Sequence, residues 1–474
     1  MTQPDFATAK PETANHATSN PALPNPALPN PVRVPLGIKP LGILGTLQTG
    51  RRNVLELVPE LATHAPILSG KTGKRWHMVM DPDALRQILR DRVEDYPKSD
   101  ITKLILSPAI GLSMFVAEGK EWHWQRRTAA PVFSHRNVAA LAPVMTAAAE
   151  RASDRIAKGV GRAVDAFDEM VTATFEVISD VTFSGGEGFD RDAIHRAIEV
   201  YIGQTAKVSL LDILGAPAWV PRPSRMIGAR QMDDIKSVAD RTIAARRDKP
   251  AVGVPDLLDL LMAGSDPTTG QRMTDAELRD NLLTFIVAGH ETTALTLSWA
   301  LYLMAHDPAC QDQARLEAQS VLGDRAATAE DVAHLPLIRR IVDESLRLYP
   351  PAAYLARTAK AKDTLLGREV LPGDTVILPI YALHRHHKLW DDPDAFRPDR
   401  FLEPKRHDRF AYLPFGDGPR ICIGANFAVQ EAVIILATLL ARFRFSQVPG
   451  RLPKPVMILT LRPEGGVWLK VDRA

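Results

Sequence analysis

Cysteine is almost absent from this sequence: the chain has 474 residues and two cysteines, Cys310 and Cys422. Two cysteines so far apart cannot build a disulfide framework, so a reducing compartment is the expected location. A cysteine that is not needed for a disulfide can be kept for its chemistry, which makes the surroundings of both residues important.

Long apolar runs are absent too, since none reaches the roughly 18–20 residues that are needed to cross a bilayer. The first residues include Asp5 and Glu12 and contain no apolar core of a signal peptide. The sequence therefore predicts a soluble, cytoplasmic protein that has no transmembrane anchor.

A large excess of charge of either sign is also lacking, because the formal net charge is +2. This balance gives no indication that nucleic acid is a partner. The composition, with 45% hydrophobic and 24% charged residues, is that of a globular protein with a large core.

Residues 1–35 are rich in Pro, Asn, Ala and Thr, and the segment Asn20–Pro24 is repeated at once by Asn25–Pro29. Such a tract lacks the apolar periodicity of a packed element, so we expect a disordered tail. No second linker of this kind interrupts residues 36–474, which we expect to form a single domain.

Helical patterns dominate this domain, so the predicted fold class is mainly α with small β-sheets. Short strand-like runs occur at residues 75–80, 375–379 and 456–461. The last run is followed by Pro, Glu and two glycines and then by residues 467–471, which predicts a hairpin of these two segments.

The longest predicted helix begins at a capping box formed by Thr274 and Glu277 and runs without proline to His306. At 1.5 Å per residue it would be roughly 48 Å long, so it must pass through the body of the domain. Residues 282–297 are apolar nearly all round, as a buried central helix requires.

The strongest chemical signal is the segment 415–424, which reads FGDGPRICIG and contains Cys422. A lone cysteine is usually an inert small hydrophobe. Here, however, three glycines permit tight backbone geometry in which N–H groups can point at a thiolate. Arg420 adds a cation suited to a carboxylate, and a helix predicted from Ala425 onward would face the anion with its N-terminus.

This segment matches the haem-binding loop of the cytochromes P-450, Phe-x-x-Gly-x-Arg-x-Cys-x-Gly, at every fixed position. The chain thus resembles a soluble, bacterial-type member of that family, with further motifs in the same order. The resemblance implies the P-450 fold, with haem b (iron protoporphyrin IX) between the long central helix and the Cys422 loop. The Cys422 thiolate would be the axial ligand, which favours O–O cleavage. Loop residues expected to contact the cofactor are Phe415, Gly416, Arg420 and Gly424.

A helix predicted to run from Pro336 to Pro350 carries Glu344 and Arg347 on one face. On its own this spacing is typical of an exposed ion pair of little energetic value. In the family the Glu-x-x-Arg pair is buried and completed by an arginine of a Pro-x-Arg-Phe segment, which corresponds to Arg400. The resemblance therefore assigns these three residues a structural role beneath the haem loop.

Trp122 and Arg126 lie one helical turn apart, so an indole N–H and a guanidinium can address one carboxylate. They match the Trp-x-x-x-Arg helix of the family, in which both side chains contact a haem propionate. Arg357 stands where many members carry a further propionate-binding arginine. The alternative is an aromatic–cation pair at the surface.

The central helix contains the segment 288–293, AGHETT, which is similar to the oxygen-activation segment of the family. Small side chains at Ala288 and Gly289 would leave room for dioxygen. Thr292 can turn its hydroxyl away from its own helix, or it can hydrogen-bond the carbonyl of Ala288 and loosen the helix. Glu291 would supply protons through water. We therefore expect Glu291 and Thr292 to be catalytic; the alternative is a helix interior with an inconsequential acid–threonine pair.

Position in the family also predicts a substrate pocket with a mostly apolar lining, suited to a small lipid-like, terpenoid or aromatic substrate. The expected lining residues are Ser113, Met114, Phe285, Ala288, Ala352, Ala353, Leu355, Ile458 and Leu459. Ser113 and the two consecutive alanines would leave space for a bulky or ringed substrate.

The stretch after Cys422 is too short for a flavin or iron–sulfur domain. We expect a monomer that receives electrons from a separate ferredoxin or flavodoxin and an NAD(P)H-dependent reductase. A basic rim of Lys120, Arg126, Arg127 and Arg136 would steer an acidic partner.

Three histidines in the segment 384–387 lack the spacing of a metal site. The family has a His-Arg pair at this place as part of its structure, so the resemblance favours a structural role for them. His290 is expected to be packed or partly solvated and not a ligand, and Cys310 is expected to have no chemical role. Two other function classes stay open: a haem-thiolate gas sensor or carrier, and a peroxide-driven oxidase or decarboxylase. The intact Glu291–Thr292 pair argues against the first, and full activity with peroxide after loss of Thr292 would favour the second.

Overall fold

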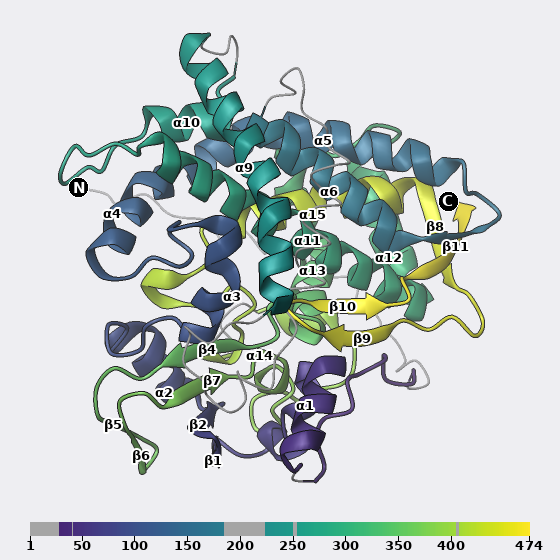
Figure 1. The fold of residues 1–474 in the computed structure, drawn as a ribbon. Coiled ribbons are helices and arrows are strands. Elements are labelled where there is room, and N and C mark those ends of the chain that lie inside the picture. Colours follow the sequence, from purple (N-terminus) through teal and green to yellow (C-terminus); the bar gives the residue numbers. More distant parts are fainter. Residues whose placement is uncertain (1–27, 40, 184–222, 250–253, 404–406) are drawn as a thin grey trace, which may run out of the picture.

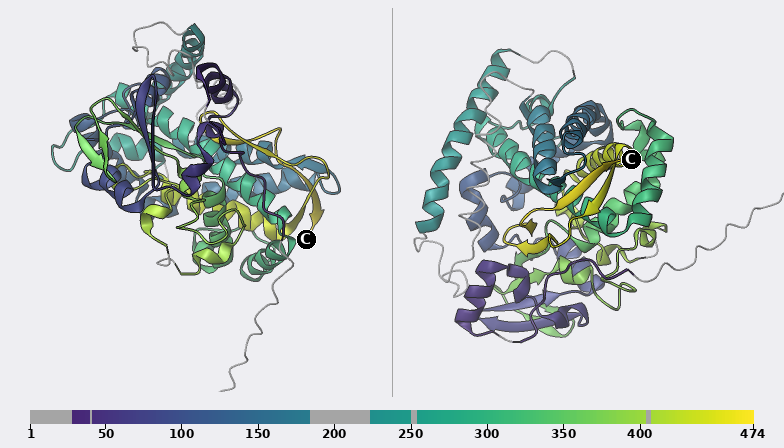
Figure 2. Two further views of the ribbon diagram at one scale, coloured as in Figure 1. Left: turned by 90° about the horizontal axis from the view of Figure 1, so that it is seen from below. Right: turned by 90° about the vertical axis from the view of Figure 1, so that its right-hand side faces the viewer.

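The computed structural model describes residues 28–39, 41–183, 223–249, 254–403 and 407–474. Helices make up most of this part of the chain. In Figure 1 small sheets lie at the lower left and at the right, and the right view of Figure 2 also shows the purple strands at the bottom apart from the yellow strands above them. The longer helices are α1 (Ile43–Arg52), α3 (Asp100–Ile110), α4 (Gly119–Ala129), α5 (His135–Ala157), α6 (Ala166–Phe183), α9 (Pro223–Asp248), α11 (Asp275–His306), α12 (Pro308–Leu322), α13 (Pro336–Leu348) and α15 (Ala425–Arg442). The short ones are α2 (Pro82–Arg86), α10 (Leu257–Ala263) and α14 (Ile380–Leu383).

Helix α11 is the predicted central helix. Its N-terminus is closed by the predicted capping box, in which the Thr274 hydroxyl accepts from the N–H of Glu277 and the Glu277 carboxylate accepts from the N–H of Thr274. Most of its side chains are buried, and it packs against α6, α9, α13 and α15 in the middle of the molecule (Figure 1). The central position follows from an apolar surface that is nearly continuous around the helix.

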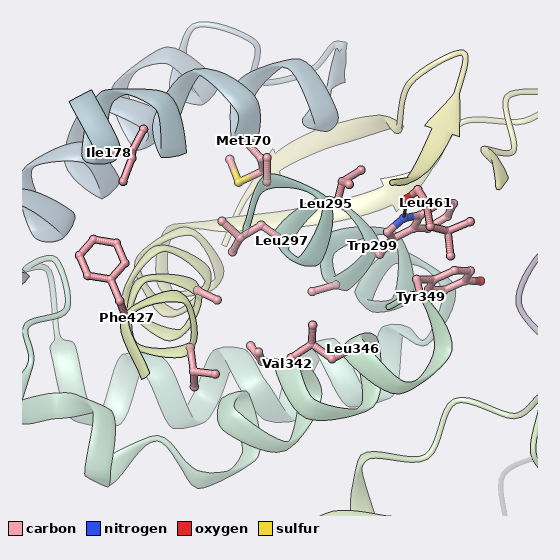
Figure 3. Close-up of a cluster of buried hydrophobic side chains, with 14 of the residues drawn as sticks. Met170, Ile178, Leu295, Leu297, Trp299, Val342, Leu346, Tyr349, Phe427 and Leu461 are labelled. Carbon is pink, nitrogen blue, oxygen red and sulfur yellow. Dashed lines mark hydrogen bonds between the residues drawn. The ribbon is translucent and has the colours of Figure 1, made fainter. Parts of the chain in front are cut away.

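Trp299 shows how α11 joins distant segments in the core (Figure 3). Its ring stacks on Tyr349, directly after α13, with centroids 4.0 Å apart, and its indole N–H donates to the carbonyl of Leu461 at 3.1 Å. All three side chains are at most 1% exposed. Burial of one such side chain stabilises the fold by roughly 1.5–3 kcal/mol.

The helices predicted before Pro350 and after Gly424 are confirmed as α13 and α15. Helix α15 is long and apolar enough to cross a membrane, and no other helix in the described ranges meets that test. Most of α15 is buried against α5, α11 and α12, as expected of a core helix.

The largest sheet has the strand order β1 (Ile67–Thr72), β2 (Lys74–Val79), β7 (Thr375–Leu378) and β4 (Leu355–Thr358). Strands β2 and β7 confirm the predicted strands at 75–80 and 375–379, and they pair in parallel. Strand β4 pairs antiparallel with β7, which sets Arg357 opposite Val376. The remaining sheets are β3 (Ala163–Asp165) with β11 (Trp468–Arg473) and β8 (Phe443–Gln447), the pair β9 (Lys454–Met457) and β10 (Leu461–Glu464), and the pair β5 (Asp363–Leu365) and β6 (Arg368–Val370).

The predicted hairpin of residues 456–461 and 467–471 is wrong. The chain turns back earlier, so β9 pairs with β10, whereas β11 pairs with β8 and β3. Gly465 and Gly466, with φ of 85° and 84°, lead the chain away from β10. Because alternate residues of β11 are buried, the strand completes the sheet of β8, whose two phenylalanines are also buried.

The predicted boundary of the N-terminal tail is too late. Residues 1–27 lie outside the described residues, but the end of the predicted tail packs on the domain. The N–H of Val32 donates to the Tyr302 hydroxyl at 3.1 Å, and the carbonyl of Val32 accepts from Tyr349 at 2.6 Å. Val34 is 1% exposed and its N–H donates to the hydroxyl of Tyr381 at 2.9 Å. Composition could not show this, because three tyrosine hydroxyls from distant segments supply the partners.

Candidate active site

The Cys422 loop lies between a short turn, Gly418–Arg420, and the N-terminus of α15. The N–H of Cys422 donates to the carbonyl of Phe415 at 2.9 Å, which closes the loop, and the N–H of Gly424 hydrogen-bonds the sulfur. Gly418 has a φ of 74°, and a Cβ there would lie 2.1 Å from the carbonyl oxygen of Leu89. Only glycine fits this position, so the loop geometry depends on it.

The Cys422 side chain is exposed, and yet the protein atoms around it remove much of its water. This desolvation raises the pKa of the thiol, whereas the Gly424 N–H and the charge of Arg126 act in the opposite direction. The Gly424 N–H and the charge of Arg126 thus favour the thiolate, although burial outweighs them.

Positive side chains gather beside this loop around one carboxylate, Glu118. Arg420 donates to Glu118 at 2.6 Å and to the carbonyls of Val93 and Tyr96 at 3.0 Å each. The buried Nε of Arg420 has no hydrogen-bond partner among the described residues. The N–H of Lys98 donates to the same Glu118 at 2.7 Å.

Arg357 and Lys98 are joined by an isolated bridge between their backbones and share this excess of charge. Burial first, and then the charge of Arg420, lowers the pKa of Arg357 to about 10. Burial also lowers the pKa of Lys98 to about 7, with Glu118 opposing and the nearby arginines adding to the shift. Desolvation likewise lowers the pKa of Arg126, which makes no ion pair with any described residue.

Trp122 lies within this group, which we call the Glu118 cluster: Lys98, Glu118, Arg126, Arg357 and Arg420. The indole is 4% exposed, with the Arg420 guanidinium 5.3 Å and the Lys98 amine 5.8 Å from its ring centroid. Four cations share one carboxylate, so positive charge is left without an anionic partner. This is unfavourable because each cation has also lost part of its hydration. A ligand with two carboxylates, such as the propionates of haem, fits this donor set.

On α11, Ala288 is exposed although residues 281–286 before it are all buried. Thr292 donates its hydroxyl to the carbonyl of Ala288 at 2.7 Å, one of the two arrangements predicted for it. Gly289 faces Ile178 of α6, where a Cβ would lie 3.3 Å from the methyl carbon. The small size of Gly289 therefore serves close helix packing, and Ala288 is the more exposed of the two residues.

Glu291 is 3% exposed, and its carboxylate contacts protein groups instead of bulk water. Its carboxylate pairs with Arg462 of β10 and accepts from the Thr460 hydroxyl at 2.8 Å. Burial opposes the charge, but Arg462 outweighs it and the pKa of Glu291 is lowered. In this arrangement Glu291 is an anion that is paired with Arg462 and accepts a hydrogen bond from Thr460.

Glu344, Arg347 and Arg400 lie together as the resemblance implies. Arg347 donates to both oxygens of Glu344, at 2.6 and 2.7 Å, and the Nε of Arg400 lies 3.4 Å from the same carboxylate. Arg347 also donates to the carbonyls of His384 and Pro393 at 2.8 and 2.6 Å. We call these three charged residues the Glu344 cluster.

His384 connects this cluster to the segment that leads into the Cys422 loop. Its Nδ1 lies 3.0 Å from the Arg347 carbonyl, and its Nε2 accepts from the N–H of Leu413 at 2.8 Å. Burial lowers the pKa of His384 to about 3, so it stays neutral. His387 instead stacks on His64, and the described residues contain no group of side chains suited to a metal ion. His384 and His387 therefore make contacts within the fold.

The predicted pocket residues do not all reach accessible surface. Ala288, Ala352, Leu355, Ile458 and Leu459 keep some, whereas Ser113, Met114, Phe285 and Ala353 are buried. Leu355 lies 3.7 Å from where a Gly416 Cβ would stand. Phe285 packs edge-to-face on Phe133, at 5.0 Å between centroids, and Phe133 lies 4.0 Å from a Cβ at Gly424. The space predicted beside Ser113 is thus closed in this structure.

Sequence reasoning missed Lys98, Glu118, Glu431 and Arg462. Glu431 could have been found, because it is the one charge inside the apolar run of α15. It is 2% exposed, hydrogen-bonds Thr293, and has an Oε1 with no hydrogen-bond partner among the described residues. Burial raises its pKa to about 8.

The other predicted residues need shorter comment. Arg127 of the expected basic rim pairs with Asp266 at 2.7 Å, which cancels its charge there, while Lys120 and Arg136 are exposed. Burial raises the pKa of Cys310 to about 12, so its thiol is unreactive. His290 is also buried, against Phe175, as expected.

Comparison with known proteins agrees with this geometry. The family model described as cytochrome P450 matches residues 35–471, and the chain belongs to this family. It is 31% identical over 436 residues to cytokinin hydroxylase of Arabidopsis thaliana, covering 87% of this chain and 83% of the relative. It is 31% identical over 426 residues to cyclooctatin synthase of Streptomyces melanosporofaciens, covering 87% and 90%.

A solved structure, the haem domain of cytochrome P450DA, has the same fold. Its TM-score is 0.75 at 27% identity, over 86% of this chain and 90% of that one. The chain is therefore a haem-thiolate cytochrome P450 monooxygenase with the mainly helical fold of that family.

Proposed function

We propose that this monooxygenase binds haem b through Cys422 and inserts one atom of O2 into a small, mostly apolar substrate of lipid-like, terpenoid or aromatic type. When bound, the haem supplies the oxygen-activating redox chemistry. The observation that carries the proposal is the Glu118 cluster beside Cys422, where a buried surplus of cations calls for a dicarboxylate. Trp122, Arg126, Arg357 and Arg420 would hold the propionates.

The remaining roles follow from the residues near the loop and on α11. Ala288, Phe415, Gly416 and Gly424 would contact the macrocycle. Thr292 would orient a hydrogen-bonded water at the oxygen site, and Glu291 would supply protons once its carboxylate is released. The Glu344 cluster would brace the loop through His384.

The accessible pocket residues are all apolar, which favours an apolar substrate. The relative named cyclooctat-9-en-7-ol 5-monooxygenase, 31% identical over 416 residues, supports a ringed substrate. We propose that the enzyme is a soluble cytoplasmic monomer. It would take electrons from a ferredoxin or flavodoxin through an NAD(P)H-dependent reductase.

The decisive test is the absorption spectrum of the reduced protein with carbon monoxide, for the wild type, Cys422→Ala and Cys310→Ala. We expect the red-shifted Soret band of a thiolate-ligated haem in the wild type and in Cys310→Ala, and its loss in Cys422→Ala. A band typical of a histidine ligand in the wild type would contradict the proposal. Substrates would then be screened by their spin-state shift of the Soret band.

A second experiment separates the peroxide-driven alternative. Product formation is compared with NADPH plus redox proteins and with hydrogen peroxide alone, in the wild type and in Thr292→Ala. We expect the reductase-driven activity to fall by at least tenfold in Thr292→Ala. Full activity with peroxide in both proteins, and none with reductase, would favour the alternative.

A further inference from the structure

The C-terminal hairpin β9–β10 contacts the central helix at a catalytic position. Thr460 ends the turn between the two strands, and Arg462 is the second residue of β10. Both side chains bind the carboxylate of Glu291. Thr460 and Arg462 flank Leu461, the first residue of β10, and both side chains reach the same carboxylate on α11.

Both strands of this hairpin are attached to the rest of the domain close to the turn. The Leu461 carbonyl accepts from Trp299, and its N–H donates to the Pro351 carbonyl at 3.0 Å (Figure 3). On β9, the amide of Asn53 donates to Pro455 at 3.2 Å and accepts from Met457 at 3.0 Å. Between these anchors only the turn, residues 458–460, keeps accessible surface.

The charge balance at Glu291 depends on this turn. Around the carboxylate, the groups that shift its charge are Arg462, the Thr460 hydroxyl and His290, whose Nδ1 lies 2.8 Å from the Ile286 carbonyl. Burial alone would favour the protonated acid, so Arg462 is what holds the anion. Arg462 keeps about a third of its side chain accessible (31%), so it can exchange Glu291 for water.

We propose that Arg462 is a positioning residue for proton delivery. Arg462 holds the Glu291 carboxylate, and the strength of this ion pair depends on the conformation of the turn 458–460. This turn carries the predicted substrate contacts Ile458 and Leu459. A substrate that presses on the turn would loosen the pair, so that Glu291 takes up a solvent proton and passes it to the oxygen site. The inference rests on the proposed function, in which Glu291 supplies protons.

The test compares Arg462→Gln with the wild type, using full-length holoenzyme, saturating redox proteins and a substrate found by the Soret shift. Without the guanidinium, the buried Glu291 acid should stay protonated to higher pH. We expect the alkaline limb of the turnover profile to move up by about one pH unit, a tenfold change in proton affinity. We also expect about tenfold faster NADPH oxidation without substrate.

Matched variants isolate the cause. Arg462→Lys should restore most of the wild-type profile, because it returns a cation. Thr460→Val, which removes only the hydroxyl, should shift the limb in the same direction by less. Lys454→Gln lies on the same hairpin and removes an exposed pair with Glu464, so its profile should match the wild type. Glu291→Gln should abolish the shift that Arg462→Gln causes.

The outcomes are distinguishable. If Arg462→Gln shows a normal carbon monoxide band and substrate shift but an unchanged pH profile and unchanged background oxidation, the inference is overturned. If the wild type lacks the thiolate band, the proposed function itself fails. If Arg462→Gln does not fold, Thr460→Val decides: a wild-type profile in that variant overturns the inference.

Discussion

The Glu118 and Glu344 clusters both bury arginines beside a single carboxylate, yet they differ in how far the protein satisfies them. Arg347 donates to both oxygens of Glu344 and to carbonyls from two further segments. Arg357, by contrast, has one side-chain hydrogen bond that the structure describes, to the adjacent Ala356 carbonyl at 2.9 Å. The Glu344 cluster is therefore complete around Arg347, although the buried Nε of Arg400 has no hydrogen-bond partner among the described residues. The Glu118 cluster is not complete.

This difference separates a structural ion pair from a ligand site. A buried cation whose donors are all hydrogen-bonded adds little further unfavourable free energy to the folded state, and it fixes the geometry of the groups around it. Burial lowers the pKa of Arg357 to about 10, and it lowers the pKa of Arg400 in the Glu344 cluster to about the same value. Buried charge and a lowered pKa by themselves therefore do not mark a functional site. The two clusters differ because Arg126 and Arg357 make no ion pair with any described residue, whereas Arg347 and Arg400 share Glu344.

The largest effect is expected from breaking the complete cluster. Glu344→Gln leaves two buried guanidinium groups without their carboxylate and should lower the free energy of unfolding by roughly 3–5 kcal/mol. Urea unfolding followed by circular dichroism measures this. Arg339→Ala is the matched control, because it removes an exposed pair with Asp343 on the same helix at a cost below about 0.5 kcal/mol. Equal effects of the two variants would contradict the distinction.

A third case, Glu431, has burial without any cation. Its pKa is raised to about 8 and an unfolded carboxyl titrates near 4.3, so its stabilising proton is kept at low pH and lost as pH rises through 8. Between pH 5 and 9 the wild type should lose roughly 2–4 kcal/mol relative to Glu431→Gln. Thermal unfolding of both proteins across that range measures the difference, and parallel curves would refute it.

A substitution in the Glu118 cluster should change haem binding and not the stability of the fold. Arg357→Ala should release haem about tenfold faster, since one charge-assisted contact of about 1.4 kcal/mol is lost. The haem-free protein should be no less stable than the wild type, because a buried charge is gone. Haem transfer to an acceptor globin gives the rate. Arg75→Ala, in the same sheet but paired with Asp374, should release haem at the wild-type rate.

The smallest effect concerns Lys98, whose pKa burial lowers to about 7. An unfolded lysine titrates near 10.4, so the haem-free protein should gain stability as pH rises from 7 to 10. Solvent screening limits this gain to roughly 1 kcal/mol. In the holoprotein the propionates should restore the ammonium charge and flatten the slope, and Lys98→Met should flatten it in both forms. A slope that survives in Lys98→Met would assign it to another group.

Local signals in the sequence were enough to place the central helix and the Cys422 loop. The capping box of Thr274 and Glu277, and the glycine spacing of the loop, depend on residues close in the chain. Arg462 was out of reach, because its partner Glu291 lies 171 positions away and nothing in either segment specifies the other. The β9–β10 pairing failed for the same reason, since strand pairing is decided by the sheet that each strand joins.

Residues 32–34 bond to three tyrosines, the last of which is 347 positions further along the chain. A ribosome adding roughly 5–20 residues per second would expose that tyrosine roughly 17–70 s after Val34 is made. The first part of the domain to be synthesised therefore waits for nearly the last part before it can dock.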